Sequence, residues 1–200
     1  MTERTGSQGE SATPTEEGAV TREFGWWDMF VAPDDDPRST DTQQLTGERR
    51  TLVTYLEDGR LTLQMKCAGL DAEQLARRSV PPSNLSLLGL VRHLANVEQT
   101  WFRLRMAGEK ADRLYRSEAE PNGDFEGAAA DPDLVTEAWE AWRTEVAFAD
   151  RYVAEAPTLD LVGAEGDVLR AVLVHLIEEY ARHNGHADLL RERIDGRVGQ

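Results

Sequence analysis

Apolar residues recur at helical spacing from residue 42 onward, and no segment shows the strict apolar–polar alternation of a half-buried strand. Four segments are long enough to be major helices, at about 42–66, 86–107, 132–156 and 167–194. An amphipathic helix buries its apolar stripe against another element. The pattern therefore predicts an all-α fold, with a four-helix bundle as its architecture.

The connections between these helices differ in length. A capping-box pattern, Asp71-Ala-Glu-Gln74, predicts a short additional helix after the first long one. Residues 109–130 show no helical pattern and contain Pro121-Asn-Gly. A connection of that length inside a compact domain is often functional or mobile. We therefore expect one long, helix-free connection between the second and third major helices.

The first 41 residues differ in character from the rest. Residues 1–22 are rich in Ser, Thr, Gly and Glu and almost lack apolar side chains, so they are expected to form a disordered acidic tail. Residues 23–41 contain an aromatic run, FGWWDMF, followed by PDDDPR, and are expected to form an extended arm. That arm either packs its aromatic side chains on the body, covers a pocket as a lid, or is exchanged with a second subunit. Residues 42–200 are expected to form the bundle itself.

Charge and cysteine content exclude several classes of protein. The chain has 22 Lys and Arg against 37 Asp and Glu, a net charge of -15, whereas nucleic-acid binding requires a positive surface. One cysteine excludes a disulfide framework and any Cys-based zinc or iron–sulfur site. No apolar run is long enough to span a membrane, and the N-terminus does not resemble a secretory signal. We expect a cytoplasmic protein with a small-molecule substrate and neither nucleic-acid nor membrane partners.

Four histidines are the most informative polar residues. His175, His183 and His186 share the last major helix with Glu179. At about 100° per residue, with His175 at zero, Glu179 falls near 40°, His183 near 80° and His186 near 20°. One helix face, at the apolar stripe, therefore carries three imidazoles and a carboxylate. His93 lies on an apolar seam of the second major helix.

Imidazole nitrogens and carboxylate oxygens are common ligands of divalent transition metals. Glu179 and His183, at positions i and i+4, together with His93 from a facing helix would make a three-residue site with open positions. His186 would be a fourth ligand or the partner of a ligand, and His175 would orient a ligand or be buried. Such a set suits zinc, nickel, iron or manganese. The alternative is purely structural: core histidines bonded to carbonyls, with the HNGH segment serving only the helix dipole.

Two helical segments carry a resemblance to a known family: SLLGLVRHLANVEQTWF (86–102) and VLVHLIEEYARHNGHADLLRERIDG (172–196). They resemble the DinB/YfiT-like metal-binding superfamily, and residues 24–200, including a DFEG segment, are similar to its actinobacterial mini-circle branch. The resemblance implies a bundle whose second helix supplies one metal ligand and whose last helix supplies two. His93 and His183 match the two histidine ligands, and the third ligand position falls on Glu179, as in mycothiol-dependent maleylpyruvate isomerases. His186 replaces the usual glutamine, which leaves its role open.

The superfamily includes transferases that use low-molecular-weight thiols such as mycothiol. The resemblance therefore implies a metal-dependent transferase or isomerase with a thiol cosubstrate. His93, Glu179 and His183 would hold zinc or nickel, with iron or manganese as further candidates, and His186 or His175 would carry a proton. The alternative is a non-catalytic bundle that binds a small ligand or a partner, with the metal structural or absent. The resemblance and the aromatic arm also suggest a homodimer.

Overall fold

The computed structural model describes residues 30–31, 35–38 and 45–199. Over these its long elements are all helices and the one β feature is an isolated bridge between Val162 and Val168, which confirms the all-α prediction. The expectations for the tail and for most of the arm lie outside the described residues. In chain order the elements are α1 (Glu48–Cys67), α2 (Ala72–Ala76), α3 (Leu87–Glu98), η3 (Gln99–Met106), α4 (Gly123–Glu126), α5 (Pro132–Glu155) and α6 (Leu169–Asp195). The segment η3 is a π-helix that continues α3 without a break.

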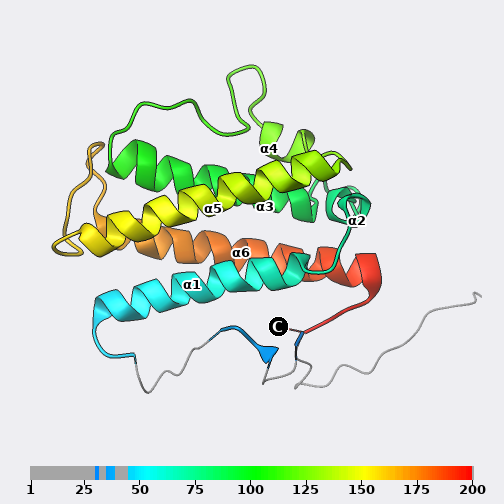
Figure 1. Ribbon diagram of the computed structural model, residues 1–200, viewed down its shortest axis with the longest axis horizontal. Coiled ribbons are helices and arrows are strands. Elements are labelled where there is room, and N and C mark those ends of the chain that lie inside the picture. The colour runs from blue at the N-terminus through cyan, green and yellow to red at the C-terminus, as the bar shows by residue number, and fades with distance from the viewer. Residues whose placement is uncertain (1–29, 32–34, 39–44, 200) are drawn as a thin grey trace, which may run out of the picture.

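The four long helices form a bundle in which α1 and α6 run in one direction while α3 and α5 run in the other (Figure 1). Helix α6 packs against both α1 and α3, and α5 packs against α3. Because α3 and α5 are parallel, the chain returns along the bundle between them. That return crossover, residues 107–131, carries the short helix α4, which packs on α3. The expectation of a helix-free connection is therefore wrong at residues 123–126.

Capping residues set the helix boundaries much as the sequence predicts. At α2 the Asp71 side chain accepts from the Gln74 N–H, and the Gln74 side chain accepts from the Asp71 N–H, so the capping box is complete. Asp131 caps α5, with Pro132 at its first position. Helix α6 ends at Gly196, whose φ of 78° lies in the left-handed region that favours glycine.

A buried polar network crosses the apolar core. The Arg60 guanidinium on α1 makes two bonds to the Glu98 carboxylate on α3, with Nε–Oε1 and Nη2–Oε2 distances of 2.7 and 2.8 Å. The Tyr180 hydroxyl donates to Glu98 Oε1 over 2.9 Å, and Trp142 Nε1 donates to that hydroxyl over 2.8 Å. A third bond joins Arg60 Nη1 to Asp150 Oδ1 at 2.7 Å. The network therefore links all four long helices through one buried guanidinium.

Phe30 is the described aromatic residue of the arm, and it is buried against the body of the protein. Its ring lies 4.2 Å from Lys66 Nζ, 4.1 Å from the Arg197 guanidinium and 5.4 Å from that of Arg191. Its carbonyl accepts from Arg197 Nη2 over 2.9 Å. At this residue the arm packs on the ends of α1 and α6; its other aromatic residues lie outside the described part.

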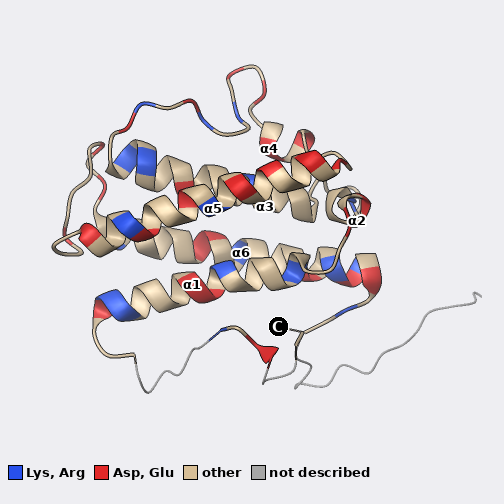
Figure 2. Ribbon diagram, viewed as in Figure 1, with Lys and Arg blue, Asp and Glu red and all other residues tan. Residues whose placement is uncertain are grey.

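Residues of both charge signs are interspersed along the helices (Figure 2). In this view the described Lys and Arg residues are interleaved with Asp and Glu and do not gather into one basic stripe. None of the described helices combines the length and the hydropathy needed to cross a lipid bilayer.

Candidate metal centre

His93 of α3 meets Glu179 and His183 of α6 where the two helices pack. One donor atom from each residue lies within 4.8 Å of the other two. Within the described chain, these three form the one such cluster of His, Cys, Asp or Glu side chains. His183 Nε2 is 3.3 Å and His93 Nε2 is 3.9 Å from Glu179 Oε2. The structure therefore brings together the three residues whose spacing suggested a metal site.

The chemistry of the cluster fits a divalent cation. Two donors that each lie about 2.1 Å from one tetrahedral ion are roughly 3.4 Å apart. Small rotations of the side chains would bring the observed distances of 3.3 and 3.9 Å to this value. The pKa of His183 is lowered to about 3, mainly because the ring is buried and to a smaller extent because of electrostatic repulsion from His93. That imidazole is therefore neutral at physiological pH, which is the form that binds a metal.

A buried carboxylate from the crossover lies beside His93. Asp124 of α4 is 1% exposed at its side chain, and its Oδ2 lies 2.9 Å from His93 Nδ1. The Phe125 ring stacks on the His93 imidazole, with centroids 5.0 Å apart and an interplanar angle of 25°. The sequence analysis missed Asp124. Its one signal was the DFEG segment, which has no metal-ligand spacing of its own.

The remaining two histidines each lie beside one member of the cluster. His186 Nδ1 is 3.3 Å from His183 Nδ1, and His186 does not belong to the group of three close donors. This geometry makes His186 a hydrogen-bonding partner of His183. His175 Nε2 lies 3.4 Å from Glu179 Oε1, and its half-exposed ring is 4.5 Å from that of Trp101.

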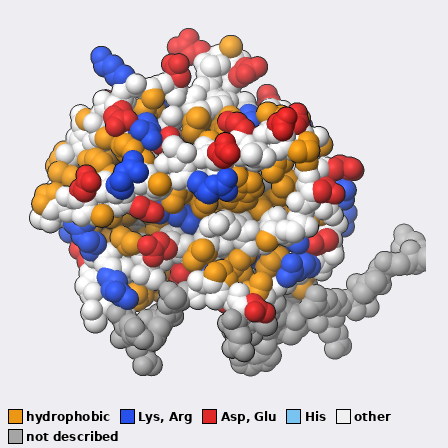
Figure 3. Space-filling model, viewed as in Figure 1, with side chains coloured by type: hydrophobic (Ala, Val, Ile, Leu, Met, Phe, Trp, Pro, Cys, Tyr) orange, Lys and Arg blue, Asp and Glu red, His pale blue; other side chains and the backbone are white. Residues whose placement is uncertain are grey.

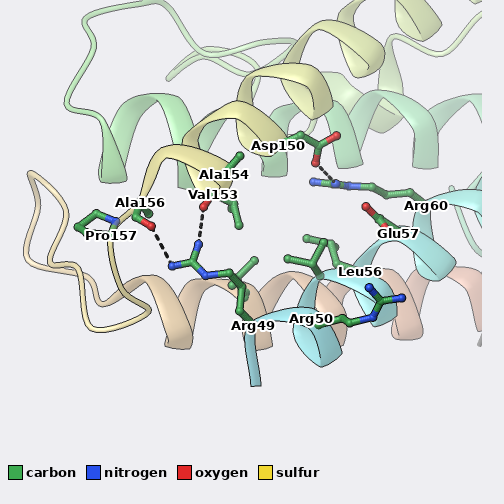
Figure 4. A pocket seen from close by; sticks show the side chains of 12 residues that line it. Arg49, Arg50, Leu56, Glu57, Arg60, Asp150, Val153, Ala154, Ala156 and Pro157 are labelled. Atoms are coloured by element: carbon green, nitrogen blue, oxygen red, sulfur yellow. Dashed lines mark hydrogen bonds and ion pairs between the residues drawn. The ribbon is translucent and has the colours of Figure 1, made fainter. Parts of the chain in front are cut away.

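A separate cavity of about 610 Å³ lies between α1 and α5, and no histidine lines it. Figure 3 views this face and shows apolar side chains exposed among charged ones. Figure 4 shows that two of the guanidinium groups that line the cavity form hydrogen bonds within the protein. Arg49 donates to the carbonyls of Val153 and Ala156, and Arg60 to Asp150. This cavity is therefore separate from the cluster of His93, Glu179 and His183.

A comparison with protein families bears on this cluster. The model of a family described as mycothiol-S-transferase matches residues 51–196. This range extends from α1 to the end of α6 and includes all four histidines and Asp124. No curated protein and no solved structure matches the chain. Because the match covers well over half of its length, the chain belongs to the mycothiol-S-transferase family.

Proposed function

We propose that the protein is a divalent-metal-dependent transferase that uses the thiol of mycothiol to attack an electrophilic small molecule. The observation that carries this proposal is the convergence of His93, Glu179 and His183 inside a chain of this family. Two neutral imidazoles and one carboxylate would leave a bound divalent cation with a net positive charge and open positions. Zinc and nickel suit this ligand set, as do iron and manganese.

When bound, a divalent cation lowers the pKa of a thiol that coordinates it, so that thiolate forms near neutral pH. The protein's own part is to orient the ligands and to take up the proton. His93 Nδ1 lies 2.9 Å from Asp124 Oδ2, and His183 Nδ1 lies 3.3 Å from His186 Nδ1, so both ligand rings have Nε2 on the side of Glu179.

We assign proton transfer to His175 and His186, the two histidines outside the cluster of three donors. The His175 side chain is 36% exposed, so its ring is in contact with water, and its Nε2 lies beside Glu179 Oε1. His175 Nε2 would accept the proton of the incoming thiol and release it to solvent, with His186 as the second candidate. The thiol sulfur then bonds to the electrophilic carbon, and the leaving group departs with its electron pair.

Metal titration tests the ligand set. Calorimetry with Zn²⁺ and Ni²⁺ is expected to show one site of micromolar affinity or tighter in the wild-type protein. His93→Ala, Glu179→Gln and His183→Ala should each remove that site. Glu178→Gln is the matched control, because Glu178 is an exposed carboxylate on the same helix. If the wild-type protein binds neither these metals nor Fe²⁺ or Mn²⁺, the proposal is wrong.

Turnover tests the reaction. The metal-loaded protein is expected to accelerate the conjugation of mycothiol to monobromobimane, and a chelator should abolish the acceleration. Equal rates with and without the metal, across a panel of electrophiles, would favour a binding module over an enzyme. The homodimer stays a prediction, which light scattering of the full chain would test.

A further inference from the structure

The Asp124 carboxylate is buried and has two hydrogen-bonding partners. Its Oδ2 lies 2.9 Å from His93 Nδ1, and its Oδ1 accepts from the Phe125 N–H over 3.1 Å. A carboxylate is costly to bury unless it is paired with donors. The His93 ring is the side chain that lies within hydrogen-bonding distance of it. The carboxylate is therefore positioned to interact with this one imidazole.

The bond to Asp124 decides which nitrogen of His93 carries the proton. A carboxylate accepts hydrogen bonds and cannot donate one, so it favours the tautomer with a proton on Nδ1. The lone pair then resides on Nε2, the atom that faces Glu179 at 3.9 Å. A carboxylate in this position also makes the imidazole more basic and fixes the plane of its ring.

Helix α4 has only four residues, and contacts with α3 hold it in place. Arg92, next to His93 in the chain, donates from Nε to the Asp124 carbonyl and from Nη2 to the Gly123 carbonyl, each over 3.0 Å. Gly89, one turn earlier, leaves room for Phe125, because a Cβ at residue 89 would lie 3.0 Å from Phe125 Cδ1. Two residues that precede His93 on α3 therefore hold the crossover over the imidazole.

We infer that Asp124 is the positioning residue of the metal centre: its carboxylate holds the Nδ1–H tautomer of His93 and directs Nε2 toward the cation. This inference rests on the proposed function for its consequence at the metal, but its first step concerns the metal-free protein. It also gives the crossover between α3 and α5 a role in the site, although the crossover supplies no ligand.

The first experiment reads the tautomer without any metal. Long-range ¹H–¹⁵N correlation spectra of the metal-free wild-type protein are expected to show His93 protonated at Nδ1. In Asp124→Asn the amide can donate to Nδ1, so the Nε2–H form should become substantially populated. Glu126→Gln removes an equal charge from the same short helix at an exposed side chain, and should leave the His93 signals unchanged.

The second experiment measures Zn²⁺ affinity by competition with a chelator. Asp124→Asn is expected to bind Zn²⁺ about 10- to 100-fold more weakly than the wild-type protein, as loss of such partners does elsewhere. Glu126→Gln should stay within about twofold. Cobalt substitution adds a spectrum, because a misdirected ligand changes the visible bands of Co²⁺.

The outcomes separate the two proposals. An Nε2–H tautomer at His93 in the wild-type protein overturns the positioning role, as does unchanged Zn²⁺ affinity in Asp124→Asn. A wild-type protein with the Nδ1–H tautomer but no metal binding would leave Asp124 as the partner of His93 and reject the proposed function. If Asp124→Asn fails to fold by circular dichroism, the wild-type tautomer alone decides.

Discussion

The guanidinium of Arg60 and the carboxylate of Glu98 form a two-point ion pair in the centre of the bundle, where both side chains are almost completely excluded from water. Arg60→Met would leave Glu98 charged, buried and without its cation. We expect a loss of about 3–5 kcal/mol in the free energy of unfolding, measured by urea denaturation with circular dichroism.

The control for that substitution is Arg77→Met. Arg77 pairs with Glu73 at 3.7 Å on the exposed surface of α2, so its loss should cost no more than about 1 kcal/mol. Equal effects of the two substitutions would show that the central pair contributes no more than a surface pair.

His186 is expected to support the metal centre without being a ligand. His186→Ala should weaken Zn²⁺ binding about 10-fold, because His183 loses the partner that fixes its ring. His183→Ala should weaken it by more than about 100-fold, because a donor atom is lost. Chelator competition would measure both, and equal losses would instead make His186 a fourth ligand.

Cys67 is expected to be unreactive in the folded protein. Burial raises the pKa of its thiol to about 12, so at pH 8 the thiolate fraction is about 1000-fold lower than in the unfolded chain. Because the folded pKa lies above the unfolded value of 9.0, deprotonation of this thiol favours the unfolded chain, so the free energy of unfolding is unaffected by it below pH 9 and falls as the pH rises from 9 toward 12. Ellman's reagent should label the single cysteine only after denaturation. Rapid labelling under native conditions would contradict the burial.

Phe30 is expected to stabilise the fold both as an apolar group and as an aromatic ring. Phe30→Leu keeps most of the apolar volume but loses the contact of the ring with three cations, and should cost about 1 kcal/mol. Phe30→Ala also creates a cavity, and should cost about 3 kcal/mol. Thermal and urea unfolding would rank the two variants. A stability unchanged in Phe30→Ala would show that the arm does not contribute to the folded state.

The four long helices could be predicted from the sequence because each has a long apolar stripe. Their ends were predicted less well where no side chain caps them: α1 begins at Glu48 rather than near residue 42. Helix α5, by contrast, begins at Pro132, directly after the predicted cap Asp131. Helix α4 could not be predicted, because four residues are too few to show a period. Its contacts with Arg92 and His93 are tertiary, and no local sequence pattern reports them. The π-helical turns of η3 could not be predicted either, because the apolar spacing there does not distinguish them from an α-helix.

The convergence of His93, Glu179 and His183 was predictable to the extent that it depends on helix geometry. The spacing of Glu179 and His183 places them on one face of α6. His93 was predicted as the third donor from its place on the apolar seam of a facing helix, and the family resemblance pointed to the same residue. Asp124 was not predictable, because it lies 31 residues after His93 in a stretch without periodicity. The sequence thus indicates the donors of the cluster, while the arrangement around them depends on packing.

The parallel course of α3 and α5 determines how well the segment between them tolerates insertions and deletions. An antiparallel pair needs only a tight link of a few residues, whereas here the polypeptide must retrace the length of the bundle. That return path is bound to η3, because the side-chain amide of Gln99 donates to the carbonyl of Asp112 and accepts from the N–H of Leu114. An insertion or deletion in this stretch is therefore expected to displace Asp124 from His93 before it lowers the melting temperature of the bundle.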